Sequence, residues 1–135
     1  MALIDWSPKM SVGIASIDAD HRKLVVLVND LYEAMSVGEG SKVLDRVLDE
    51  LIQYTRTHFV REEGLFRTHG YEHEAEHKAE HDKLLRTVDD LRRRVDAGER
   101  VSPVATGSFL KQWLTEHIQG SDMAYSAFLI SKGVR

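Results

Sequence analysis

Apolar residues recur at spacings of three and four in four separate stretches of the chain. Such spacing places them on one face of an α-helix, and no sustained alternation of apolar and polar residues predicts a strand. The pattern predicts four amphipathic helices, at roughly residues 19–37, 42–66, 71–97 and 103–119. The connections between them are short, so neighbouring helices should run antiparallel. We therefore predict an all-α protein with an up-down-up-down four-helix bundle.

The two ends of the chain lack this periodicity. Residues 1–18 predict a non-helical N-terminal arm, and residues 122–135 predict a short C-terminal tail helix that docks on the bundle. Ser102 followed by Pro103 is a typical helix start, which supports the beginning of the fourth helix. The chain has 135 residues, the size of one domain with its own core, and we place that single domain at residues 1–135.

The composition limits the classes of function. The hydrophobic fraction of 42% and the charged fraction of 30% are typical of a soluble globular protein, and a net charge of −4 argues against nucleic acid as the main partner. There is no cysteine, which excludes disulfides, zinc–thiolate sites and thiol catalysis. No apolar stretch is long enough for membrane insertion and no secretory signal is present, so we expect a cytoplasmic protein. Its heavily charged outer helix faces favour a monomer.

Ionisable side chains interrupt the apolar faces of all four predicted helices. They are His21, His58, Glu62, His77, His81 and His117. Buried polar groups cost free energy unless they are paired, and ionised carboxylates cost most. His77 and His81 are four residues apart, so one helix face offers two imidazoles to one ion, and His58 and Glu62 repeat that spacing. A lone inward histidine is more often a hydrogen-bonded core residue, but inward donors on every helix predict a metal site.

Asp122 is a further candidate next to the fourth helix. It follows His117 by five residues, which places the two side chains about 140° apart on an ideal α-helix. The two can converge if the helix widens or ends there, and Gly120 between them supplies the backbone freedom. The candidate donors are then five histidines and two carboxylates.

This donor set is too large for one ion but suits two, and it favours iron, although zinc and manganese are not excluded by donor type. We suppose that both carboxylates and one water-derived oxygen bridge two octahedral ions. The ligands then fill eleven of twelve positions: five from histidines, four from carboxylates and two from the bridging oxygen. If His77, His81 and His117 share one ion, the open position belongs to the ion held by His21 and His58. A small ligand bound there would be walled by Leu24, Phe59, Trp113 and Leu114.

Four short motifs follow one another in the order of the helices: "DADHRKL", "HFVREE", "HKAEH" and "HIQGSD". With these motifs the chain resembles the hemerythrins, specifically single-domain bacteriohemerythrins, whose helices carry in turn a histidine, HxxxE, HxxxH and HxxxxD. The resemblance covers nearly the whole chain, and no ligand position is missing. It implies an oxo- or hydroxo-bridged pair of iron ions, with Glu62 and Asp122 as the bridging carboxylates. It also implies reversible dioxygen binding at the five-coordinate iron, the one held by His21 and His58.

Other interpretations of the same residues are weaker. His69 and His73 match no ligand position of the family, and we expect both at the surface. The letters HKAEH also match the HxxEH motif of inverted zinc peptidases, with Glu80 as general base, but four other inward donors are then unexplained. A ferritin-like di-iron oxidase needs two Glu-x-x-His motifs, and only Glu74 with His77 qualifies.

Three uses of such a site stay open. The first, which we prefer, is reversible dioxygen binding for oxygen storage or for delivery to an oxygen-consuming enzyme. The second is oxygen or redox sensing through a separate partner protein. The third is a di-iron enzyme that acts on peroxide or nitric oxide. The inward faces offer no further acid or base near the open position, which favours a carrier over an enzyme.

Overall fold

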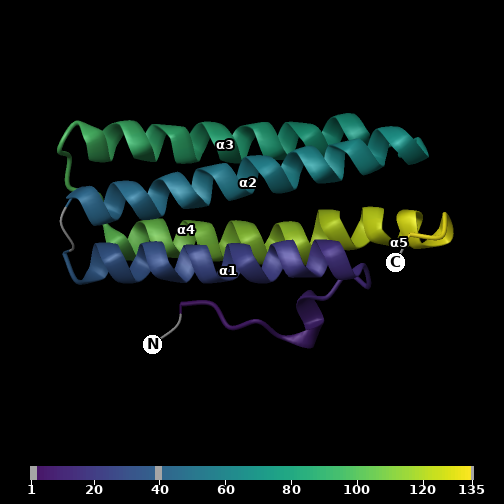
Figure 1. Cartoon of the computed structure of the whole chain (residues 1–135), viewed down its shortest axis with the longest axis horizontal. Helices are drawn as coiled ribbons and strands as arrows, with labels where there is room; N and C mark the ends of the chain where they lie inside the picture. Colours follow the sequence, from purple (N-terminus) through teal and green to yellow (C-terminus); the bar gives the residue numbers. More distant parts are fainter. Residues whose placement is uncertain (1–2, 39–40, 135) are drawn as a thin grey trace.

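Four long helices lie side by side and make up most of the molecule (Figure 1). The computed structural model describes residues 3–38 and 41–134, and its long helices are α1 Ala15–Ser36, α2 Ser41–His69, α3 Glu74–Asp96 and α4 Pro103–Glu116. Each runs antiparallel to the helix before it, and α1 packs against both α2 and α4, while α2 also packs against α3. The predicted all-α, up-down-up-down bundle is confirmed.

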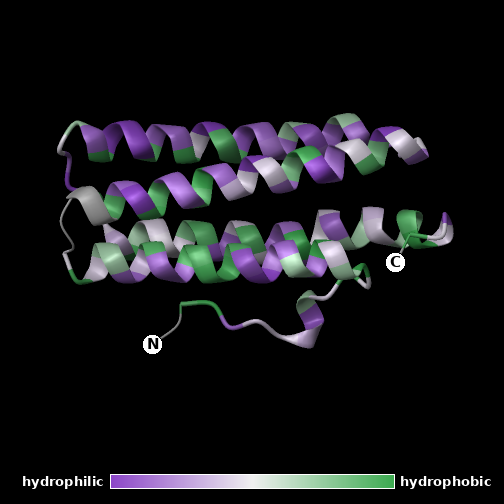
Figure 2. Ribbon diagram, in the orientation of Figure 1, coloured by the Kyte–Doolittle hydropathy of each residue, from purple (hydrophilic) through white to green (hydrophobic). Residues whose placement is uncertain are grey.

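The apolar faces of the helices meet in one core that runs along the bundle. Hydrophobic and hydrophilic residues alternate around each helix, and α3 is the most hydrophilic of the four (Figure 2). On α4, Phe109 follows the helical spacing of the apolar residues but is 42% exposed, whereas Leu110 and Leu114 are buried. Within the described ranges, no helix is both long enough and apolar enough to cross a membrane.

The N-terminal arm is partly helical, which corrects the prediction of a non-helical segment over residues 1–18. Pro8–Met10 forms a 3₁₀ turn (η1), and α1 begins at Ala15, four residues before the predicted start. The additional helical turn forms because Ile17 lies four residues before His21 and extends the buried face of α1. The arm is held against α1 by two hydrogen bonds between the Ile4 backbone and the Asn29 side chain. Ile4 N donates to Oδ1 of Asn29, and Nδ2 of Asn29 donates to the Ile4 carbonyl, both at 2.9 Å.

The turn between α2 and α3 is shaped by Gly70. Its φ of +69° is a left-handed conformation that glycine adopts without strain, and α2 therefore ends at His69, three residues beyond the predicted end. The turn that follows delays the start of α3 to Glu74, three residues after the predicted start. The other helix boundaries lie within one residue of the prediction, except the C-terminal end of α4.

The fourth helix does not end near residue 119, and Asp122 does not lie in a separate tail. The chain passes from α4 into a π-helical turn, η2 His117–Asp122, and then directly into α5 Met123–Ser131. The continuation is stabilised by burial, because Tyr125 and Leu129 of α5 are fully enclosed by the core. The predicted C-terminal helix thus exists as an extension of α4 (Figure 1).

Two glycines inside helices allow a test of this packing. Gly107 is buried on α4, and a Cβ atom there would lie 2.7 Å from the Tyr32 ring of α1. We expect Gly107→Ala to lower the free energy of unfolding by roughly 1–3 kcal/mol through overpacking. Gly64 on α2 has no neighbour within 4 Å of such an atom, so Gly64→Ala should raise it by up to about 1 kcal/mol. Chemical denaturation of both variants checks the two opposite signs.

Candidate metal centre

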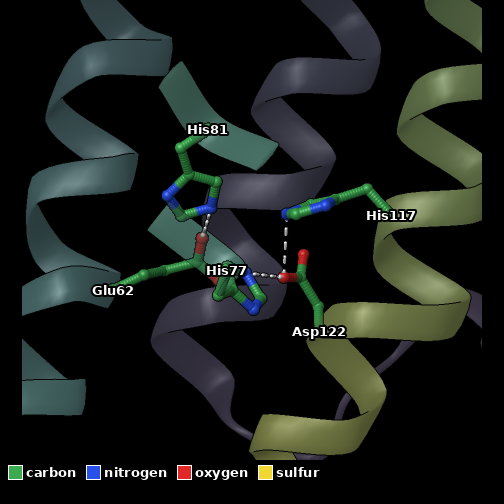
Figure 3. Close-up of side chains that lie close together, drawn as sticks. All are labelled: Glu62, His77, His81, His117 and Asp122. Atoms are coloured by element: carbon green, nitrogen blue, oxygen red, sulfur yellow. Dashed lines mark ion pairs between the residues drawn. The ribbon is translucent and has the colours of Figure 1, made fainter. Parts of the chain in front are cut away.

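The seven predicted donors lie together in the middle of the bundle. His21 comes from α1, His58 and Glu62 from α2, His77 and His81 from α3, and the last two from the π-helical turn: His117 and Asp122. Each is at most 5% exposed, so all of them are buried within an otherwise apolar core. Five of these side chains point toward one another in the close-up (Figure 3).

The donors form two overlapping groups. One contains three histidines and both carboxylates, and the other contains two histidines and the same two carboxylates. Within each group, one ligand atom from every residue lies within 4.8 Å of all the others. Glu62 and Asp122 belong to both groups, as two bridging carboxylates would.

Asp122 faces the two groups with different oxygens. Its Oδ2 lies 3.0 Å from Nε2 of His21, whereas its Oδ1 lies 2.9 Å from Nε2 of His77 and 3.1 Å from Nε2 of His117. Glu62 uses a single oxygen, since Oε1 lies 3.2 Å from Nε2 of both His58 and His81. Each carboxylate therefore contacts histidines of both groups.

These contacts are short, yet most of them are not hydrogen bonds. The atoms without a hydrogen-bond partner in the described part of the chain include Nε2 of four histidines, Glu62 Oε1 and both Asp122 carboxylate oxygens. Atoms aimed at a common point rather than at each other are the arrangement that a metal ion requires. Adjacent ligands of an octahedral ion with bonds of about 2.1 Å lie about 3 Å apart, which matches the observed separations. The donors present therefore fit metal ions.

The π-helical turn explains how His117 and Asp122 come to share a group. A π-helix repeats its hydrogen bonds over five residues rather than four, so residues five apart lie on the same side. The turn covers the six residues from His117 to Asp122, and it reduces the offset that an ideal α-helix would give. Of the two arrangements that the spacing allowed, the structure has the widened helix.

Several residues outside the predicted set contact the outer side of the cluster. Nδ1 of His58 lies 2.8 Å from Asp20, Nδ1 of His81 lies 3.0 Å from Glu63, and the Tyr125 hydroxyl donates to Oε2 of Glu62. The sequence analysis did not identify these partners. Asp20 directly precedes His21, and Tyr125 follows Asp122 by three residues on a continuous helix, so adjacency and helical spacing were the signals available.

The comparisons with known proteins agree with this geometry. The family model described as hemerythrin HHE cation binding domain matches residues 12–129. The chain belongs to the hemerythrin family. It is 36% identical to a bacteriohemerythrin of Stenotrophomonas maltophilia over 93% of this chain and 81% of that protein. It is 35% identical to a bacteriohemerythrin of Methylococcus capsulatus over 96% of this chain and 98% of that protein.

Solved structures extend the comparison to the fold. A crystal structure of a wild-type hemerythrin matches with a TM-score of 0.87 and 33% sequence identity, covering 93% of this chain and 97% of that one. The resemblance inferred from the four motifs is thus confirmed, and a single hemerythrin domain accounts for most of the chain. The buried histidine and carboxylate cluster is consistent with a di-iron, dioxygen-binding site of this family.

A small apolar cavity of about 30 Å³ lies between the helices and includes all four predicted wall residues: Leu24, Phe59, Trp113 and Leu114. Two of them also contact the histidines directly. The Phe59 ring stacks on His81 with centroids 3.6 Å apart, and the Trp113 ring stacks on His117 at 4.4 Å. Both stacked histidines belong to the three-histidine group, so these aromatic walls also fix ring orientations in the hemerythrin cluster.

The remaining histidines and the peptidase motif lie apart from the cluster. His73 is exposed beside Glu72 and Glu76, as predicted, whereas His69 is half-buried at the end of α2. Glu80 of the HxxEH motif accepts hydrogen bonds from the Ser121 hydroxyl at 2.8 and 2.9 Å and lies on the outer side of the histidines. A general base for a zinc-bound water would have to face inward, so the peptidase interpretation fails.

In the metal-free hemerythrin cluster, protons on the histidines supply the positive charge that metal ions would otherwise supply. Burial lowers the pKa of His58, but the charge of Glu62 and the hydrogen bond to Asp20 raise it to about 10. Burial and the charge of Asp122 raise the pKa of Glu62, but the charge of His58 offsets them and brings it to about 2. Burial also raises the pKa of Asp122, and the charge of His117 holds it well below its usual range. Metal binding must therefore displace protons from the histidines.

This pairing predicts how the stability of the metal-free protein depends on pH. The raised pKa of His58 contributes stability below its ordinary value of 6.5 that is lost as the pH rises toward 10. The lowered pKa of Glu62 contributes stability above its ordinary value of 4.5 that is lost as the pH falls toward 2. The free energy of unfolding of the chelator-treated chain should therefore be greatest between about pH 4.5 and 6.5.

Chemical denaturation at a series of pH values checks this. His58→Gln serves as the control, since it should remove the part of the alkaline decline that comes from His58. A wild-type stability that stays constant from pH 6.5 to 10 would contradict the pairing.

Proposed function

We propose that this hemerythrin holds two iron ions in the bundle core and binds dioxygen there reversibly, for storage or for delivery to an oxygen-consuming enzyme. The observation that carries the proposal is that Glu62 and Asp122 belong to both donor groups. A shared pair of carboxylates holds two ions close together, which two separate zinc or calcium sites would not need. The histidine-rich donor set favours iron among the metals that bind such groups.

The contacts support one assignment of residues to the two ions. One ion would be held by three histidines: His77, His81 and His117. The other would be held by His21 and His58, and both would share Glu62 and Asp122. Because the second ion would have one histidine fewer, it would keep the open position. Iron bound there would supply the electrons and the coordination site that dioxygen requires.

The chain's own residues keep the site suited to a reversible reaction. Apolar and aromatic side chains line the cavity, and they limit the access of water and protons that would convert a carrier into an oxidase. Thr55 is the polar side chain of that lining, and its hydroxyl donates to the Leu51 carbonyl at 2.6 Å. The lining therefore supplies no acid or base for turnover, and this favours a carrier over an enzyme.

An anaerobic titration tests the function directly. The purified chain is reduced, its iron is counted, oxygen is admitted and then removed, and the visible spectrum is followed throughout. We expect two irons per chain and a charge-transfer band that appears with oxygen and fades when oxygen is withdrawn. Irreversible conversion to a diferric spectrum would instead support an oxidase, a peroxidase or a redox sensor. Two zinc ions without colour would refute the oxygen proposal.

Leu114 offers a test of the cavity wall. It is 5% exposed and lies in the cavity lining, so Leu114→Ala should admit water and hasten autoxidation to the diferric form, by roughly tenfold for a barrier lowered by about 1.4 kcal/mol. Leu91→Ala is the matched control, because Leu91 is also buried but lies outside that lining. Autoxidation rates are compared by the decay of the oxygenated spectrum. Equal acceleration in both variants would show general loosening of the bundle rather than a role for this wall.

A further inference from the structure

A buried carboxylate connects α1 to the outer side of the two-histidine group. Asp20 is 3% exposed, and its Oδ2 lies 2.8 Å from Nδ1 of His58. The other ring nitrogen of His58 faces the cluster, 3.2 Å from Glu62. An ionised carboxylate only accepts hydrogen bonds, so Nδ1 must carry the proton. In a neutral ring, Nε2 is then left with a lone pair directed at the metal position.

Asp20 is itself held by two further donors from α2. Nη1 of Arg61 lies 2.8 Å from each of its carboxylate oxygens, and the Tyr54 hydroxyl donates to Oδ1 at 3.1 Å. The carboxylate is therefore shared among three partners on α2: the His58 ring, the Arg61 guanidinium and the Tyr54 hydroxyl. A guanidinium within 2.8 Å of both oxygens favours the ionised carboxylate.

The outer partners of the three-histidine group are different. Nδ1 of His81 lies 3.0 Å from Glu63, and Nδ1 of His117 lies 3.5 Å from Glu80, whose carboxylate is 45% exposed. Among the ion pairs of the described residues, Asp20 is the only carboxylate that contacts both a guanidinium and a cluster histidine. Nδ1 of His21 has no hydrogen-bond partner in the described part of the chain. The outer environment of the two-histidine group therefore depends on Asp20.

We propose that Asp20 and Arg61 are a positioning pair that selects the ring tautomer of His58 and sets its donor strength toward the two-histidine ion. The inference rests on the proposed di-iron function, and it names the residues that tune the ion at which dioxygen would bind. A carboxylate that draws the Nδ1 proton makes the imidazole a stronger donor, and a stronger donor stabilises the ferric state. Arg61 moderates this effect, because it takes up part of the carboxylate's charge.

Opposite effects are therefore expected from two substitutions that break the same ion pair. Asp20→Asn removes the charge and weakens the donor, so the reduction potential of the di-iron protein should rise. Arg61→Gln removes the cationic partner that competes with His58 for the carboxylate, so the potential should fall. A merely structural role for the pair would move both potentials in one direction or in neither. Spectroelectrochemical titration measures both shifts.

Metal binding supplies a readout that does not involve oxygen. In a calorimetric titration with Co²⁺, Asp20→Asn should weaken one of two binding steps by about 10- to 100-fold and leave the other near the wild-type value. Glu63→Gln, the equivalent change beside His81, should weaken the other step. Arg56→Gln is the matched arginine control on the same helix, because its partner is the exposed Asp89. It should change neither step nor the potential.

Ring-nitrogen NMR of the zinc-loaded chain examines the tautomer itself. The expected wild-type spectrum has the proton of His58 on Nδ1 and the metal on Nε2. A proton-free Nδ1, or potentials of the Asp20 and Arg61 variants that shift together, would overturn the inference while leaving the di-iron proposal intact. A wild-type chain that binds fewer than two ions would overturn the di-iron proposal and this inference with it.

Discussion

Seven ionisable side chains are buried at the centre of an otherwise apolar bundle, and the rest of the structure is arranged to make that burial tolerable. An isolated charge in such a core would cost far more free energy than the whole fold supplies. Each donor therefore needs an opposite charge, a proton or a metal ion on its inner side. The two i, i+4 pairs, on α2 and α3, and the widened turn at the end of α4 place all the donors within reach of one another. Local helix geometry thus follows from an electrostatic requirement at the centre.

The same requirement explains the extension of the fourth helix. Asp122 faces histidines of both groups through two different oxygens, whereas Glu62 does so through one. The second oxygen of Glu62 accepts a hydrogen bond from Tyr125, which lies on α5 and is fully buried. Had the chain left the bundle after Gly120, that oxygen would have lost its donor within the core. The C-terminal helix therefore completes the cluster as well as the hydrophobic packing.

The sequence predicted the fold and the inner donors because both obey short-range helical spacing. His77 and His81 share a face whatever the tertiary structure, and four apolar faces leave few ways to pack. Asp20 lies beside the apolar face of α1, and only the crossing of α1 and α2 brings it to His58. Phe109 shares the periodicity of α4 but lies at the edge of its buried face, where the neighbouring helices leave it exposed. Partners fixed by helix crossings cannot be derived from spacing alone.

The inner donors and the residues around them govern different aspects of function. The inner donors form the candidate metal site, and they lie in the four motifs by which the chain resembles the hemerythrins. The properties that separate a carrier from a sensor or an enzyme depend on what surrounds those donors: the protons held at their outer nitrogens and the water admitted to the open position. In this chain, carboxylates of unequal burial contact the outer side of the histidines, and an apolar cavity lies beside Phe59 and Trp113, which stack on two of them. Chains with the same seven donors can therefore differ in oxygen chemistry when these surroundings differ.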